Sequence, residues 1–115
     1  QRLMEMHFGV WEQQRWNDIG DKRLKAWMAD FVNQRCSGGE SYQDLFERAV
    51  AFWNELCQQE LDRVLIVTHG GTIRALLTYL LDVPLKNAFR IAIDFGSVTK
   101  IRQLDYGPVI DYVNR

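Results

Sequence analysis

The stretch VLIVTHGGTIRALL, residues 64–77, decides how this chain folds. It opens with β-branched and leucine residues in a run without polar alternation, which is typical of a strand buried on both faces of a parallel sheet. His69 and a Gly-Gly pair follow, and an apolar helical pattern begins at Thr72. This order predicts an α/β fold with His69 at the carboxyl end of the strand, where open α/β sheets bind their ligands.

The residues at this junction predict an anion site. Gly70 and Gly71 permit an unusual turn and the close approach of a ligand. The first N–H groups of the following helix have no intrahelical partner, and the positive end of the helix dipole lies beside them. Together with the His69 imidazole, these donors suit a phosphate group. From the residues alone, the alternative is a turn histidine that only caps the helix.

Apolar residues recur with helical spacing in three segments. The expected helices are residues 21–35, 42–60 and 72–83. Ser41 precedes the second helix, and Asp44 three residues later completes a capping-box pattern. Pro84 ends the third helix, because proline cannot continue the helical hydrogen-bond pattern.

Beyond Pro84, apolar and polar residues alternate in short runs separated by glycine-containing turns. The expected strands are residues 89–95, 97–104 and 109–113. They predict an antiparallel edge on a mostly parallel sheet, with helices on the two faces of that sheet. Since no linker or repeat interrupts the chain, residues 1–115 are expected to form a single domain.

Composition excludes several classes of partner. The chain has 14 basic and 15 acidic residues, a net charge of −1 and no basic stripe, which argues against nucleic acid. No apolar run approaches the ~20 residues that a bilayer crossing needs, so we expect no membrane partner. Cys36 and Cys57 lack metal-ligand spacing and are expected to be reduced, mostly buried thiols of a cytoplasmic protein.

Three segments of the sequence resemble a known family. VLIVTHGGTIRALL closely resembles the second-histidine motif of the histidine phosphatase superfamily, which includes cofactor-dependent phosphoglycerate mutases. Residues 3–19 resemble the segment around that family's proton-donating glutamate, and residues 37–53 are similar to its Gly-Glu-Ser stretch. The three motifs occur in the family's order. Residues 89–114 look most like the α-ribazole phosphatase branch, which dephosphorylates α-ribazole 5′-phosphate in cobalamin biosynthesis.

The resemblance implies a mechanism and assigns roles to residues. In such enzymes a histidine nucleophile takes the phosphoryl group of a phosphomonoester and water then hydrolyses the phosphohistidine. Glu5 aligns with the acid that protonates the leaving group. His69 aligns with the second histidine, which binds the phosphoryl oxygens, and Gly70 with a position whose N–H approaches the phosphate. The resemblance implies no metal and no cofactor.

One part of the family pattern has no counterpart in the chain. The Arg-His-Gly motif, which supplies the nucleophile from the first strand, does not occur, and His7 lies in a different context. Residues 1–115 therefore match the C-terminal part of the family's domain, which predicts a truncated three-layer αβα fold with little or no phosphatase activity alone. We also expect the uncovered strand at residues 64–68 to promote a homo-oligomer.

Alternatives remain open at this point. A noncatalytic module could bind phosphorylated metabolites, and a mutase could move phosphate between hydroxyls, although residues 20–37 lack the longer insertion that is usual in mutases. A zinc site of Glu5, His7 and His69 is a third alternative. Arg74 lies on the polar side of its helix and is expected to be solvated. Aromatic residues that could contact a ring-bearing substrate are Trp11, Trp16 and Trp27.

Overall fold

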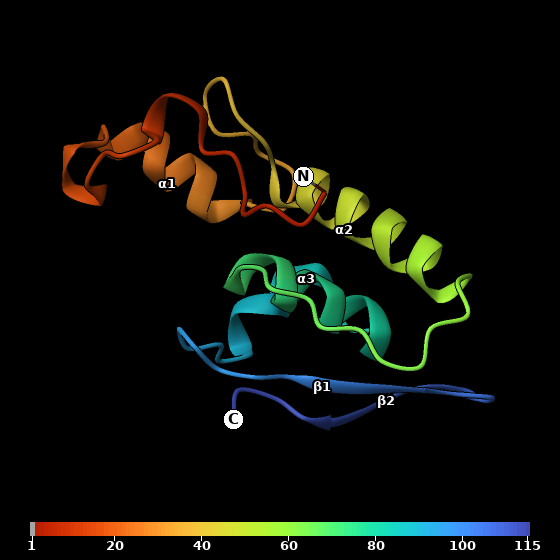
Figure 1. The fold of residues 1–115 in the computed structure, drawn as a ribbon. Coiled ribbons are helices and arrows are strands. Elements are labelled where there is room, and N and C mark those ends of the chain that lie inside the picture. Colours follow the sequence, from red (N-terminus) through yellow and green to blue (C-terminus); the bar gives the residue numbers. More distant parts are fainter. Residues whose placement is uncertain (1) are drawn as a thin grey trace.

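The computed structural model describes residues 2–115. Its helices are α1 (Asp21–Ala29), α2 (Tyr42–Cys57) and α3 (Gly70–Leu81), and its strands are β1 (Lys100–Leu104) and β2 (Gly107–Tyr112). Short 3₁₀ turns cover Gly9–Trp11, Trp16–Asp18 and Leu85–Arg90. Figure 1 shows α3 between α2 and the hairpin formed by the two strands. The N-terminal segment runs along the start of α2 toward α1 (Figure 1).

The start of α2 confirms the predicted capping box. The Ser41 hydroxyl accepts a hydrogen bond from the Asp44 N–H at 3.1 Å, and the Asp44 carboxylate accepts one from the Ser41 N–H at 3.0 Å. These two bonds satisfy N–H groups that the helix cannot pair internally. The helix ends at Cys57, three residues before the predicted end.

Helix α1 is shorter than the apolar pattern predicts. It ends at Ala29, and the carbonyl groups of Phe31 and Val32 accept hydrogen bonds from the N–H groups of Tyr42 and Gln43, at 3.1 and 2.9 Å. The last part of the predicted helix therefore accepts hydrogen bonds from the unpaired N–H groups in the first turn of α2, and it does not continue α1. The Phe31 side chain still packs against the core.

The core lies where the N-terminal segment and α1 meet the first turns of α2. It consists of Met6, Trp11, Ile19, Cys36, Tyr42, Leu45, Ala75 and Ala88. Aromatic rings surround it, because Trp27 contacts Trp11 edge-on at 6.0 Å between centroids and Phe31 contacts Tyr42 at 5.7 Å. This packing fixes the N-terminal segment against α2 and α3.

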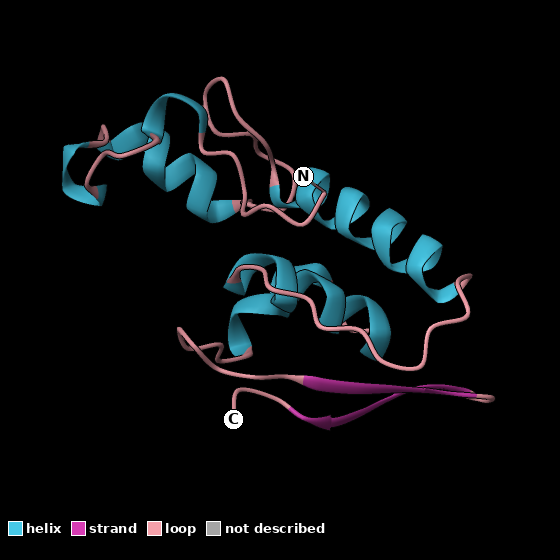
Figure 2. Cartoon of the chain, in the orientation of Figure 1, coloured by secondary structure: helices cyan, strands magenta, loops and turns pink. Residues whose placement is uncertain are grey.

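The predicted strand at residues 64–68 does not join a sheet. The segment is extended, but it has no strand partner among residues 2–115, and Figure 2 shows it as a loop. Leu65 and Val67 are each 88% exposed. The prediction that this edge lacks its cover agrees with the structure, while the prediction that these residues lie in a parallel sheet is wrong within the described part of the chain, because no second strand lies beside them.

The C-terminal region contains two of the three predicted strands. Strands β1 and β2 pair antiparallel, with Arg102 opposite Val109 and an irregularity after Lys100. The predicted strand at residues 89–95 is wrong: a 3₁₀ turn covers Leu85–Arg90 and the following residues form no strand. Their alternating pattern lacks a partner edge in this part of the structure, so no ladder forms.

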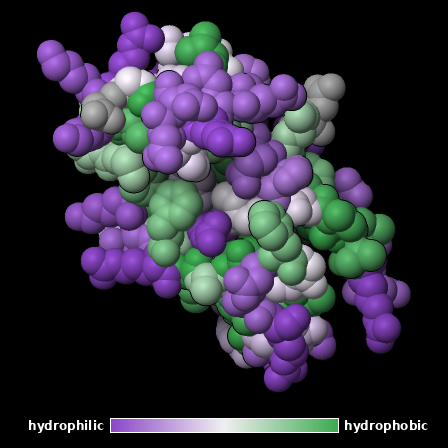
Figure 3. All heavy atoms as spheres, turned by 90° about the vertical axis from the view of Figure 1, so that its left-hand side faces the viewer, coloured by the Kyte–Doolittle hydropathy of each residue, from purple (hydrophilic) through white to green (hydrophobic). Residues whose placement is uncertain are grey.

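On the face viewed in Figure 3, hydrophobic residues form separate patches among hydrophilic ones. Cys36 is buried as expected, whereas Cys57 is exposed, and neither is in a disulfide. Burial raises the pKa of the Cys36 thiol to about 11, so it stays protonated at neutral pH. Within residues 2–115, no helix combines the length and apolar character that a bilayer crossing requires.

Candidate active site

Two segments far apart in sequence meet at the start of α3. The Thr68 hydroxyl donates a hydrogen bond to the Leu3 carbonyl, and the Thr72 hydroxyl donates to the Met4 carbonyl at 3.1 Å. These bonds place the N-terminal segment across the first turn of α3, beside the His-Gly-Gly sequence. Residue 5 therefore reaches the junction that the sequence singles out.

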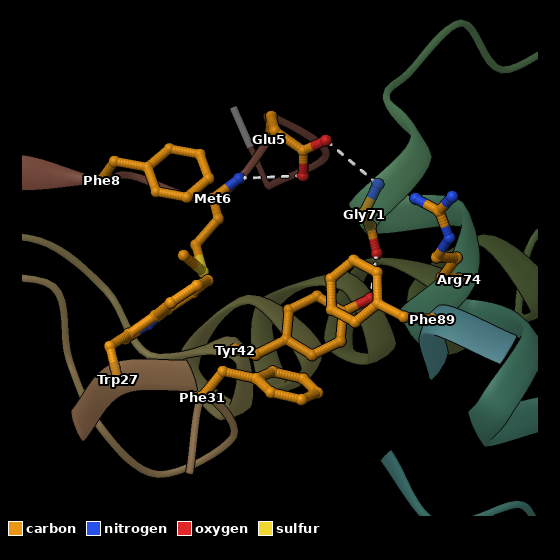
Figure 4. A pocket seen from close by; sticks show the side chains of 9 residues that line it. All are labelled: Glu5, Met6, Phe8, Trp27, Phe31, Tyr42, Gly71, Arg74 and Phe89. Carbon is orange, nitrogen blue, oxygen red and sulfur yellow. Dashed lines mark hydrogen bonds between the residues drawn. The ribbon is translucent and has the colours of Figure 1, made fainter. Parts of the chain in front are cut away.

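The Glu5 carboxylate binds the N-terminal end of α3. Its Oε2 accepts a hydrogen bond from the Gly71 N–H at 3.0 Å, and its Oε1 accepts one from the Met6 N–H at 3.1 Å (Figure 4). The Gly71 N–H is one of the first-turn donors without an intrahelical partner, and the helix dipole favours a negative group there. A carboxylate has about four acceptor positions, so these two bonds leave room for a proton and a substrate oxygen.

Gly71 is required for this contact. A Cβ atom at position 71 would lie 2.2 Å from Oε1 and 3.0 Å from Cδ of Glu5. A larger residue would thus displace the carboxylate. The sequence predicts glycines here for close approach, and the group that approaches most closely in the structure is the Glu5 side chain.

His69 lies one residue before α3, in the N-cap position. Its backbone is extended, with φ −117° and ψ 160°, and its side chain makes no capping hydrogen bond. The alternative of a histidine that only caps the helix therefore does not describe this side chain. The residue is exposed, so its imidazole can meet a ligand from solvent. Gly70 follows it, and a Cβ there would lie 3.0 Å from Nη1 of Arg74.

Tyr42 supports Gly71 from the interior. Its hydroxyl donates a hydrogen bond to the Gly71 carbonyl at 2.6 Å, and its side chain is buried. Burial is the main reason that the pKa of Tyr42 is raised, and the negative charge of Glu5 adds to it. The phenol is therefore neutral at physiological pH and remains a donor. Gly71 is thus bonded to Glu5 through its N–H and to Tyr42 through its carbonyl.

Arg74 corrects an expectation drawn from the sequence. It is half-buried rather than solvated: its Nε donates to the Ile91 carbonyl at 2.8 Å, and its guanidinium lies 5.3 Å from the centre of the Phe89 ring. Figure 4 shows Glu5 and Arg74 on either side of Gly71. The sequence spacing could have indicated that Arg74 lies near the junction, because position 74 is one helical turn after Gly70 and shares its face.

A pocket opens beside Glu5, Gly71 and Arg74. Its cavity volume is about 90 Å³, and most of the residues that line it are aromatic (Figure 4). The aromatic residues that line it are Phe8, Trp27, Phe31, Tyr42 and Phe89. Of the three tryptophans considered for a ring-bearing substrate, only Trp27 borders this pocket; Trp11 and Trp16 line a second hollow.

The zinc alternative has no support in the geometry. No group of three histidine, cysteine or acidic side chains within residues 2–115 is arranged to hold a metal ion. Glu5, His7 and His69 therefore do not form such a cluster. His7 instead uses its Nδ1 to accept a hydrogen bond from the Gly9 N–H at 3.2 Å.

Comparison with known proteins identifies the family. The sequence profile of the histidine phosphatase superfamily (branch 1) matches residues 1–115. The chain belongs to the histidine phosphatase superfamily. It is 29% identical to the adenosylcobalamin/alpha-ribazole phosphatase of Salmonella typhimurium, over 82% of this chain and 48% of that protein. It is 32% identical to the metal-independent phosphoserine phosphatase of Arabidopsis thaliana, over 64% of this chain and 33% of that protein.

Solved structures agree with this membership. The alpha-ribazole phosphatase from Shigella flexneri superposes with a TM-score of 0.89 at 26% sequence identity, and the match covers 99% of this chain and 58% of that one. This histidine phosphatase chain thus spans about half the length of the relatives named above, apart from the plant enzyme, of which it spans a third. Its fold is a truncated form of their α/β fold.

Proposed function

We propose that this chain provides the acid and the phosphoryl-binding half of a phosphomonoester phosphatase. Glu5 is the proton donor, and His69 and the Gly70 N–H bind the phosphoryl oxygens. The observation that carries the proposal is the Glu5 carboxylate hydrogen-bonded to Gly71, two residues after His69, at the N-terminal end of α3. An acid and a set of anion donors at one helix end suit transfer of a phosphoryl group from an alkoxide leaving group.

The reaction has two steps. In the first, a histidine nitrogen attacks phosphorus, the bond to the ester oxygen breaks, and Glu5 gives its proton to that oxygen. In the second, water attacks phosphorus, the phosphorus–nitrogen bond breaks, and the proton lost by the water returns to the Glu5 carboxylate. His69, the Gly70 N–H and the dipole of α3 stabilise the charge on the phosphoryl oxygens in both steps.

The nucleophile belongs to an Arg-His-Gly motif, which this sequence does not contain. We therefore expect little or no turnover by residues 1–115 alone, and turnover by a complete gene product that carries the motif. A noncatalytic phosphate-binding module is the second candidate, because the anion donors at α3 do not depend on the nucleophile.

The pocket suggests the substrate. Five aromatic side chains face a space next to the proton donor, which suits a leaving group that carries a planar ring. We propose α-ribazole 5′-phosphate, in which the ring would lie among these side chains and the ester oxygen would lie beside Glu5. The relatives named as alpha-ribazole phosphatases support this choice, and the relative named as a phosphoserine phosphatase supplies the competing substrate.

The test is turnover by the complete gene product on α-ribazole 5′-phosphate, phosphoserine and 3-phosphoglycerate. We expect α-ribazole 5′-phosphate to have the highest kcat/KM. Glu5→Gln should lower kcat by about 10²–10⁴-fold, the range for removal of a general acid or base. His69→Ala should lower it by a similar factor, and the matched control Glu55→Gln, which changes an exposed carboxylate, should not.

Each outcome decides a different part of the proposal. Full rates in Glu5→Gln and His69→Ala would show that the site residues are wrong. Preference for phosphoserine would show that the substrate is wrong, and interconversion of phosphoglycerates would favour the mutase. Binding of inorganic phosphate without turnover by the complete gene product would favour the noncatalytic module.

A further inference from the structure

Arg48 of α2 lies away from the pocket but contacts the backbone that carries Glu5. Its Nη1 donates hydrogen bonds to the carbonyl groups of Arg2 and Met4, at 2.8 and 2.7 Å. Its Nη2 donates to the carbonyl of Glu5 itself, at 3.0 Å. One guanidinium thus binds three carbonyl groups of the segment that reaches the start of α3.

Glu40 holds the guanidinium and also binds the same segment. Its two carboxylate oxygens accept hydrogen bonds from Nε and Nη2 of Arg48, both at 2.9 Å. Its Oε1 also accepts from the His7 N–H at 2.9 Å, and its own N–H donates to the His7 carbonyl at 2.7 Å. The side chains of this ion pair are only 20% and 23% exposed, so water screens it less than a surface pair.

The donors of Arg48 are fully used. A guanidinium has five N–H groups in a planar fork, and the structure gives this one five hydrogen bonds, two to Glu40 and three to backbone carbonyls. A lysine has three donors and no fork, so it cannot reproduce the arrangement. The pair therefore fixes the backbone on both sides of Glu5, while Gly71 fixes the carboxylate.

We propose that Arg48 and Glu40 are positioning residues for Glu5, which hold its carboxyl group at the N-terminal end of α3 for proton transfer. The proposal rests on the function proposed above for Glu5. Neither residue lines the pocket, so neither acts on the substrate directly. Because a displacement of about 1 Å in a reacting group can cost about a hundredfold in rate, loss of the pair should affect the chemical step more than binding.

The first experiment measures hydrogen exchange on this chain. The Gly71 N–H is a specific reporter, because its acceptor is Oε2 of Glu5. In Arg48→Met and Glu40→Gln we expect exchange at Gly71 to rise about tenfold, while the amides of Ala75 to Leu77 change little. Arg48→Lys should lie between these variants and the wild type. The control Arg102→Met removes an arginine that pairs with Asp111 on the hairpin and should leave Gly71 unchanged.

The second experiment uses two leaving groups in the complete gene product. An alkyl phosphate needs a proton from Glu5 as its ester bond breaks, whereas p-nitrophenyl phosphate leaves as a stable anion. In Arg48→Met and Glu40→Gln we expect kcat for the alkyl ester to fall about tenfold to a hundredfold with KM nearly unchanged. The rate for p-nitrophenyl phosphate should change much less.

The outcomes separate the two proposals. Equal loss on both leaving groups, or unchanged exchange at Gly71 in both variants, would overturn the positioning role. If Glu5→Gln itself showed no leaving-group dependence, the proposed function would fail, whatever the exchange data show. Should Arg48→Met not fold, Glu40→Gln decides, because it keeps the volume of the side chain while it removes the charge and one of the two acceptor oxygens.

Discussion

Two segments outside the helices meet at the start of α3, and they differ in what holds them. Residues 2–7 are bonded to the side chains of Arg48 in α2, Thr72 in α3 and Thr68 just before α3. Residues 64–67 have mostly exposed apolar side chains and no strand partner within residues 2–115. The comparison shows that the N-terminal segment is held at this site by hydrogen bonds between side chains and backbone, whereas the segment with the stronger apolar pattern stays uncovered.

The largest effect is expected at Gly71, whose N–H is bonded to the Glu5 carboxylate. Gly71→Ala places a Cβ against the Glu5 carboxylate but introduces a better helix former. We expect kcat of the complete gene product on an alkyl phosphomonoester to fall about a hundredfold. The free energy of unfolding should stay within about 1 kcal/mol of the wild type. Gly20→Ala, which meets open space, is the control, and full activity in Gly71→Ala would contradict the site geometry.

The uncovered segment should cause self-association. Leu65→Lys combined with Val67→Lys replaces two side chains that are 88% exposed and apolar. We expect this chain to associate at high concentration, and the double variant to bind itself at least about tenfold more weakly in sedimentation equilibrium, because charged residues block strand edges. Tyr106→Lys, at an exposed position on the hairpin turn, should have no such effect. A monomeric wild-type chain at high concentration would refute the prediction.

A smaller effect is expected from the interior support of the site. Tyr42→Phe removes the hydrogen bond to the Gly71 carbonyl without changing the ring. Loss of one buried hydrogen bond should lower the free energy of unfolding by about 1–2 kcal/mol, as measured by urea denaturation. Tyr79→Phe, which removes an exposed hydroxyl contact to Asn54, should change stability much less. Equal losses of stability in the two variants would contradict the prediction, because the buried hydrogen bond to Gly71 would then contribute no more than the exposed one.

The smallest effect is expected in the pH dependence of the free energy of unfolding, through Glu40. The hydrogen bonds from Arg48 lower the pKa of Glu40 from its ordinary value of 4.5. A lowered carboxyl pKa stabilises the fold above the ordinary value, and that stabilisation is lost as the pH falls through the lower, folded value. We therefore expect the unfolding free energy of Glu40→Gln to decline less than that of the wild type as the pH falls below 4.5. Parallel declines would contradict this origin.

The helices and the capping box could be predicted because they depend on local spacing. The apolar run at residues 64–68 is typical of a buried strand. A strand forms a ladder only beside a second strand, and the sequence pattern does not tell whether one is present. The same reason explains the wrong strand at residues 89–95. A local pattern therefore predicts a helix more safely than a sheet.

The candidate site was predictable only in part. Glu5, His69 and Gly70 followed from motifs, and the structure brings Glu5 to the residue after Gly70. Arg48 and Glu40 lie within the motif at residues 37–53, but the motif gave them no role, because hydrogen bonds to backbone carbonyls leave no residue pattern on the segment they bind. The half-buried position of the Arg74 side chain could not be predicted either, because its partners Ile91 and Phe89 lie beyond the helix.

The saturated guanidinium of Arg48 has a consequence for how the N-terminal segment can vary. Its three carbonyl partners are at fixed positions before and at residue 5, so side chains there can change while the backbone bonds persist. Inserting or deleting one residue between positions 2 and 7 would shift the register, so that either Arg48 loses acceptors or position 5 moves away from α3. The length of this segment, more than its composition, is therefore under constraint.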